Sequence, residues 1–90
     1  MPTIWGHLEH VDELSARAPH IQVRTVLSGG IVMRVRATIG AQTHIARGIE
    51  PVEVSGLRKG EFVEVSYRQG REGRLEAETI YVRPEQTVVD

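Results

Sequence analysis

The stretch that decides the fold is residues 20–39, HIQVRTVLSGGIVMRVRATI. Apolar and polar residues alternate along it, as they do in strands that bury one face. The polar turn Ser28-Gly29-Gly30 divides the stretch into two halves. The odd-numbered residues share one face of each half, and they are Ile21, Val23, Thr25 and Leu27, then Ile31, Met33, Val35, Ala37 and Ile39. The pattern predicts a β-hairpin whose odd residues lie in the core.

The length of the turn fixes the register of this hairpin. A three-residue turn over 28–30 keeps the odd residues of both strands on one face, and its glycines suit the left-handed backbone position. A two-residue turn over Gly29-Gly30 would put one apolar face into water. The three-residue turn predicts three outer-face pairs, which are Arg24 with Arg34, Gln22 with Arg36 and His20 with Thr38.

The segment before the hairpin predicts a further strand over residues 3–11. Its alternation puts Ile4, Gly6 and Leu8 on the inner face, and Trp5, His7 and Glu9 on the outer face. Val11 breaks this parity, which indicates a β-bulge near His10. A glycine at position 6 indicates a tight bend or a close approach of another backbone. Residues 12–18 favour either one short helical turn or an irregular loop.

The second half of the chain predicts a closing hairpin. Residues 61–68 form a strand with Val63, Val65 and Tyr67 inward. Residues 74–83 form the last strand, in which Ile80 and Val82 fall out of phase with Leu75 and Ala77, so we expect a bulge near Glu78-Thr79. Between the hairpins, the glycines and Pro51 of residues 40–56 predict loop with at most a short strand over 43–46.

Composition limits the class of protein. Ninety residues make one domain, expected over residues 1–84 with a tail over 85–90. Cysteine is absent, which excludes disulfides, thiol catalysis and cysteine-bound zinc, and we expect a cytoplasmic protein. The start of the chain has no signal-peptide pattern, and no apolar run approaches the roughly 18 residues of a membrane span, so no membrane partner is expected.

Charge is distributed unevenly although the net charge is only −1. Residues 14–49 contain no Asp or Glu. The same residues contain five arginines, which are Arg17, Arg24, Arg34, Arg36 and Arg47. Residues 50–90 contain six basic and nine acidic residues. The asymmetry either arises by chance in a short chain or marks a basic face.

Residues 54–67, VSGLRKGEFVEVSY, and residues 73–82, GRLEAETIYV, look like the closing hairpin of small bacterial domains of the oligonucleotide/oligosaccharide-binding (OB) fold. Residues 4–8, IWGHL, resemble the first strand of those domains. The resemblance implies a small, five-stranded, partly open OB-type barrel. It implies no catalytic residues, and many such domains have no assigned activity.

Strands two and three form the usual ligand face of OB barrels. On that face the sequence predicts a basic surface made by Arg24, Arg34, Arg36 and Gln22, with Trp5 as a nearby stacking platform for a base. The alternative is that acidic residues of other strands neutralise these arginines, and Glu64, Glu76 and Glu78 are the candidates.

Four histidines suggest a metal site, with His7 and His10 as its nearest pair in sequence. Regular strand geometry points these two to opposite faces, and only the expected bulge could bring them together. Three nearby residues could then add oxygen ligands, namely Glu9, Asp12 and Glu13, so metal capture near His7 and His10 stays a minor third hypothesis. His20 and His44 have no obvious ligating neighbours. No zinc-ligand spacing is matched. No serine lies in a nucleophile elbow, and no glycine-rich loop precedes a helix. We therefore expect no metal, no cofactor and no enzymatic activity.

These observations favour a non-enzymatic interaction module that binds a protein partner or itself. The expected contacts are a strand edge and the surface around Trp5, where Phe62 shares the outward parity. The alternative function is weak, sequence-tolerant binding of single-stranded nucleic acid through the basic outer face of the residue 20–39 hairpin.

Overall fold

The computed structural model describes residues 2–12, 19–70 and 73–83. A helical turn was one alternative for residues 12–18, and all of this segment except residue 12 lies outside the described ranges. The expected tail over 85–90 lies outside them as well. The described residues form strands joined by turns, which confirms the all-β class. The elements are β1 (Thr3–Asp12), β2 (His20–Val26), the 3-10 turn η1 (Ser28–Gly30), β3 (Val32–Arg47), β4 (Glu50–Pro51), the 3-10 turn η2 (Val54–Gly56), β5 (Phe62–Gln69) and β6 (Leu75–Arg83).

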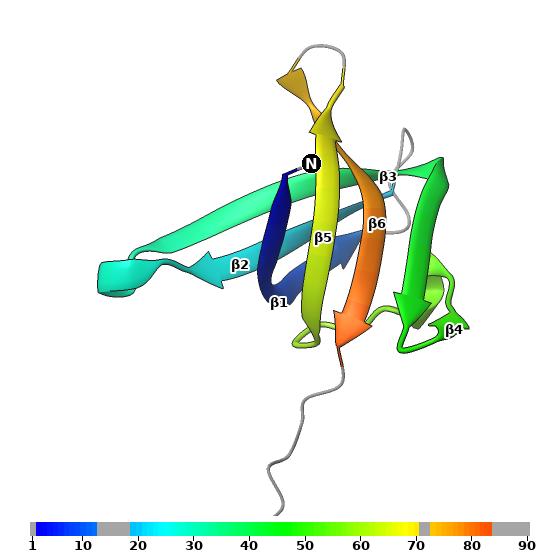
Figure 1. Ribbon diagram of the computed structural model, residues 1–90, viewed down its shortest axis with the longest axis horizontal. Coiled ribbons are helices and arrows are strands. Elements are labelled where there is room, and N and C mark those ends of the chain that lie inside the picture. The colour runs from blue at the N-terminus through cyan, green and yellow to red at the C-terminus, as the bar shows by residue number, and fades with distance from the viewer. Residues whose placement is uncertain (1, 13–18, 71–72, 84–90) are drawn as a thin grey trace, which may run out of the picture.

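The strands form one sheet that closes into a ring. Their order is β2-β1-β5-β6-β3-β4, and β2 also pairs with β3, so five strands complete the ring. The short strand β4 pairs antiparallel with the last residues of β3, outside the ring. All pairs are antiparallel except β3 with β6, which run parallel. Figure 1 shows β1, β5 and β6 standing side by side while β2 and β3 cross behind them. This connectivity is compatible with an OB-like barrel.

In the parts of the strands that the ring encloses, the buried side chains follow the predicted alternation. Ile21, Val63 and Val65 are completely buried, as is Ile80 after the bulge in β6. Tyr67 is half-buried and packs against this core. The remaining buried apolar residues are Ile4, Leu8, Val23, Ala37, Ile39, Ile45, Ala46, Leu57, Ala77 and Val82.

Both predicted bulges are present. In β1, Leu8 pairs with Val23 and His10 pairs with Gln22, so Glu9 is the extra residue. In β6, the register shifts where Ser66 pairs with Thr79 and Tyr67 pairs with Ala77, which leaves Glu78 as the extra residue. Each bulge returns the following apolar residues to the inner face of the ring.

The hairpin has the predicted register, but its outer part is not buried. Leu27, Ile31 and Met33 were expected in the core, and all three are exposed. The reason is the reach of the neighbouring strands. On one side β1 pairs with β2 only as far as Arg24, and on the other side β6 joins β3 only from Thr38. Beyond these residues the hairpin projects from the ring as a two-stranded arm (Figure 1).

The expectation of a loop over most of residues 40–56 is wrong. Strand β3 continues through Gly40 to Arg47, with an irregular stretch between Ile39 and His44 in its pairing with β6. The side chain of Thr43 links this stretch to β6. Its Oγ1 accepts a hydrogen bond from Gly40 N at 2.9 Å and donates one to Ala77 O at 2.7 Å. A glycine is tolerated here because the irregular stretch needs no packed side chain.

Among the described residues, no helix has the length and apolar character that crossing a membrane requires.

The close approach predicted at Gly6 is present and gives a direct test of the fold. A Cβ atom at Gly6 would collide with the carbonyl oxygen of Arg24 and lie 2.8 Å from Cγ1 of Val23. Gly6→Ala should therefore lower the free energy of unfolding by about 3 kcal/mol in urea denaturation. The matched control is Gly40→Ala, because no atom lies within 4 Å of its added Cβ. Equal stability of the two variants would contradict the contact between β1 and β2.

Candidate functional site

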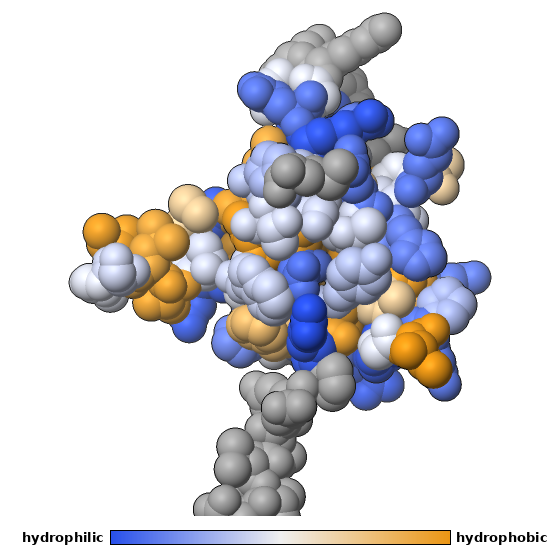
Figure 2. All heavy atoms as spheres, viewed as in Figure 1, coloured by the Kyte–Doolittle hydropathy of each residue, from blue (hydrophilic) through white to orange (hydrophobic). Residues whose placement is uncertain are grey.

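The end of the arm is apolar on both of its faces. We define the arm tip as the five exposed residues Val26, Leu27, Ile31, Val32 and Met33. Val26 pairs with Val32 across the hairpin, so these two cover the face opposite Met33. Ile31 is the most exposed of the five, at 62%. Figure 2 shows apolar residues gathered at the far end of the arm, away from the polar surface over β5 and β6.

The arm also carries an unpaired strand edge. The amide of Leu27 donates to Ile31 O at 2.7 Å, and the amide of Ile39 donates to Pro19 O at 2.8 Å, so odd residues of β3 turn their backbone groups toward β2. Those of Val32, Arg34 and Arg36 therefore point the other way. Within the described ranges no strand pairs with β3 there, because β6 joins only at Thr38. We call this segment, residues 32–36, the β3 edge.

All five residues predicted for a ligand face lie on the outer side of β1, β2 and β3. The predicted pairs of Arg24 with Arg34 and Gln22 with Arg36 are both present. Trp5 lies on β1 two residues from His7, which is the partner of Arg24. The sequence therefore placed these side chains on one face correctly, although their chemistry depends on a residue that the prediction left out.

That residue is Glu9, the bulged residue of β1. Its Oε1 accepts hydrogen bonds from Arg34 Nε at 2.8 Å and from Gln22 Nε2 at 2.7 Å. The hydrogen bond from Gln22, followed by that from Arg34, holds the pKa of the Glu9 carboxyl below its ordinary value. Glu9 therefore neutralises part of the basic face. The predicted bulge was the available signal, because it brings the extra residue of β1 beside the pair formed by Gln22 and Arg36.

The acidic residues proposed to neutralise the arginines are engaged elsewhere. Glu64 accepts from Arg83 at 2.7 Å, and Glu76 and Glu78 lie 3.2 Å and 3.9 Å from Arg68. Arg24 and Arg36 have no ion pair with any residue of the described ranges. On the outer face, Arg36 therefore has no carboxylate partner in these ranges, while Arg24 forms no ion pair but lies close enough to Glu9 to help lower the pKa of its carboxyl.

An aromatic cluster borders this face. The rings of Trp5 and Phe62 are 6.1 Å apart between centroids, and His7 meets Phe62 edge-on at 5.2 Å. The guanidinium of Arg83 lies 5.0 Å from the centre of the Trp5 ring, a distance suited to a cation–π contact. Trp5 nevertheless remains 45% exposed. The cluster thus holds Trp5 in place while leaving part of its ring open to solvent.

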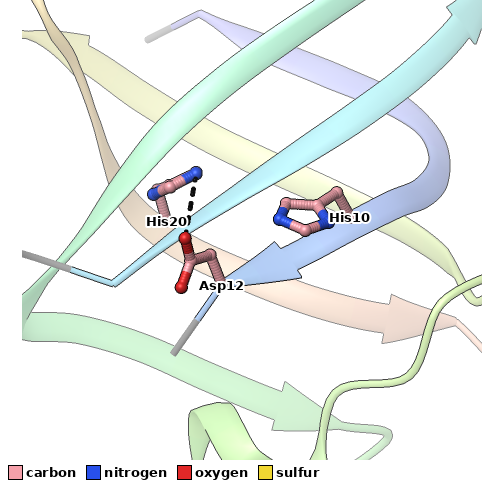
Figure 3. A group of neighbouring side chains, drawn as sticks. All are labelled: His10, Asp12 and His20. Carbon is pink, nitrogen blue, oxygen red and sulfur yellow. Dashed lines mark ion pairs between the residues drawn. The ribbon is translucent and has the colours of Figure 1, made fainter. Parts of the chain in front are cut away.

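A third group of side chains lies where β1 ends and β2 begins. His10, Asp12 and His20 project on the same side of these two strands (Figure 3). The sequence interpretation that His20 has no ligating neighbour is wrong, because Asp12 is its cross-strand partner. The pairing of His7 with His10 is also absent, since His7 packs on Phe62. The register between the consecutive strands β1 and β2, set by the bulge at Glu9, brings the three residues together.

No family model matches this chain, and neither a curated protein nor a solved structure does. The resemblance to OB-fold domains is therefore supported by strand connectivity alone. The chemistry of the surface has to be inferred from the arm, the outer face and the His10, Asp12 and His20 group.

The Glu9 interaction predicts a pH dependence of stability. A carboxylate whose pKa is lowered by folding stabilises the native state above its unfolded pKa of about 4.3, and this contribution is lost as the pH falls through the lower native value. Glu9→Gln should therefore lose less stability than the wild type between about pH 6 and about pH 3 in urea denaturation.

The matched control is Glu53→Gln, which removes an exposed glutamate from the loop before η2. This variant should keep the acid sensitivity of the wild type. If Glu9→Gln shows the same loss of stability at low pH as the wild type, the hydrogen bonds to Glu9 do not form in solution.

Proposed function

We propose that this chain is an OB-type interaction module that docks onto a protein partner through its projecting arm. The observation that carries the proposal is the arm tip, where five large apolar side chains are exposed next to one another. Contiguous apolar surface of this kind usually marks a site of contact, because monomeric proteins rarely leave it in water. The β3 edge lies beside the tip and supplies backbone groups for an added strand.

The arrangement of the arm suits insertion into a groove. Apolar residues cover both faces of the tip, so a flat partner surface would leave one face in water. A groove with apolar walls would bury both, at about 25 cal/mol for each Å² removed from water. The turn itself adds only Ser28, Gly29 and Gly30, which need little space.

Charge favours a partner of different sequence over a second copy. Antiparallel pairing of two β3 edges about Arg34 would set Arg34 against Arg34 and Val32 against Arg36. Like charges directly opposite each other destabilise a sheet. A groove flanked by carboxylates instead complements Arg24 and Arg36, which have no ion pair within the described ranges. We therefore expect an acidic rim on the partner.

In the first test, a photo-cross-linking amino acid replaces Ile31 in the full chain expressed in cells. A second variant carries the same amino acid in place of Ile49. Ile49 is the matched control because it is an apolar residue that is 99% exposed but lies between β3 and β4, outside the arm. The expected result is one protein that cross-links at position 31 and not at position 49. Cross-links between copies of the chain at position 31 would contradict the choice of partner.

The second test measures affinity for the purified cross-linked protein by calorimetry. Ile31→Ser should weaken binding at least tenfold, which corresponds to about 1.4 kcal/mol, because it removes a central apolar contact. Ile49→Ser should leave the affinity unchanged. Both residues are exposed, so neither change should lower the stability of the chain. Equal affinities for the two variants would contradict docking through the tip.

A second candidate function is binding of single-stranded nucleic acid along the outer face. The observation that favours it is that Arg24 and Arg36, which form no ion pair within the described ranges, lie on the same side as the partly open ring of Trp5. Guanidinium groups suit phosphates, and an aromatic ring suits stacking with a base. Glu9 opposes this function because it occupies Arg34 and Gln22.

This candidate is tested by fluorescence anisotropy with a labelled single-stranded oligonucleotide of mixed sequence at low and high salt. Binding through phosphates should weaken steeply with salt. The double change Arg24→Glu and Arg36→Glu should abolish it, while Arg58→Glu, on the loop before β5, should reduce it far less. Undetectable binding at low salt, or equal loss in both variants, would exclude the outer face as a nucleic-acid site.

A further inference from the structure

The geometry points to a binding site for one divalent transition-metal ion, with zinc as the best fit, formed by His10, Asp12 and His20. One ligand atom of each residue lies within 4.8 Å of the others. Asp12 Oδ2 and His20 Nε2 are 3.9 Å apart, and the rings of His10 and His20 are 6.0 Å apart between centroids. Figure 3 shows His20 paired with the Asp12 carboxylate and His10 beside them on β1.

Strand pairing holds the three side chains together. His10 and Asp12 are two residues apart on β1, so they share a face. Asp12 is the direct partner of His20 on β2. His10 is the partner of Gln22, which lies two residues after His20 and therefore on the same face of β2. The bulge at Glu9 is necessary, because without the extra residue His10 would take the inward parity of Leu8.

Burial fixes the backbone beneath the site. Val11 packs against the core between His10 and Asp12, and its partner Ile21 is completely buried. These two residues anchor the strands from below while the three polar side chains point outward. The backbone positions of the site are therefore set by the core and do not depend on a bound ion.

The donor set fits a transition metal. Imidazole nitrogen suits zinc, copper, iron and nickel, whereas calcium and magnesium prefer oxygen ligands throughout. Zinc binds nitrogen at about 2.0–2.1 Å and carboxylate oxygen at about 2.0–2.2 Å, which separates two tetrahedral ligands by about 3.4 Å. The distance between Asp12 and His20 is already close to this value. Small side-chain rotations would bring the three atoms to these distances.

Access and coordination number favour an open site. His10 is exposed, while the side chains of His20 and Asp12 are 19% and 32% exposed, so an ion can enter from solvent. Within the described ranges the group has three members. Three protein ligands leave a fourth tetrahedral position for water or for a side chain of a bound partner.

The charges around the site are mixed. Arg36 lies in the same row as His10, across Gln22, and its positive charge opposes a cation. Glu9 is adjacent to His10 in sequence, but its carboxylate already holds Arg34. Among the described residues of this group, Asp12 is therefore the one that brings a negative charge to the ion. This makes the Asp12 carboxylate the most informative group to change.

The experiment is a calorimetric titration of the full chain with zinc chloride near neutral pH. The wild type should bind one zinc ion per chain. Asp12→Asn keeps the size of the side chain and removes its charge, and it should weaken binding at least tenfold. His10→Ala should do the same. His44→Ala is the matched control, because His44 is exposed on β3 and lies against Tyr81, outside the group.

A second readout distinguishes this site from adventitious binding to any histidine. In NMR spectra, zinc should shift the imidazole resonances of His10 and His20 and leave those of His7 and His44 in place. The absence of zinc binding by the wild type would overturn the proposal. It would also be overturned if Asp12→Asn bound zinc as the wild type does, or if His44→Ala lost as much affinity. The result does not depend on the docking function of the arm.

Discussion

The constraint on which the rest of the structure depends is the length of the β2–β3 pairing relative to the strands on either side of it. This pairing extends from His20 with Thr38 to Val26 with Val32. The flanking strands cover only the inner part of this pairing, since β1 pairs with β2 only as far as Arg24 and β6 pairs with β3 only from Thr38. The same hairpin therefore closes the ring at one end and projects into solvent at the other. Its inner residues stabilise the fold, and its outer residues are available for contact.

A second constraint acts where β1 crosses onto β2. Gly6 allows the backbone of β1 to approach Arg24 closely, and the bulge at Glu9 follows three residues later. The extra residue has two effects on the outer face. It brings a carboxylate to Arg34 and Gln22, and it turns His10 toward Asp12 and His20. One inserted residue thus sets both the charge of the basic face and the composition of the proposed metal site.

Much of this could be predicted from the sequence, because alternation reports which side of a strand each residue occupies. The all-β class and both bulges follow from parity, and the hairpin register follows from parity together with the length of the turn. The exposure of Leu27, Ile31 and Met33 could not be predicted, since parity does not report how far the neighbouring strands reach. The full length of β3 was missed because glycine and proline within residues 40–56 resemble loop signals, while the irregular pairing of β3 with β6 accommodates Gly40.

The contacts across strands were the least predictable part. The ion pair of Glu9 with Arg34 joins residues on β1 and β3, and the group of His10, Asp12 and His20 joins β1 to β2. Such contacts depend on the register between strands, and a bulge changes that register by one residue. The predicted face of Arg24, Arg34 and Arg36 was correct because one hairpin fixes the register of β2 against β3 without a bulge.

The projection of the arm is tested most directly by hydrogen exchange of individual backbone amides in the monomeric chain, followed by NMR. The amides of Val32, Arg34 and Arg36 should exchange rapidly, because they face away from β2 with no strand beside them. Those of Val35 and Ala37 should be protected by β2, and that of Val65, which is buried in β5 between β1 and β6, should exchange most slowly. Uniform protection from residue 32 to residue 38 would contradict the account, because it would mean that the β3 edge is covered within the chain itself.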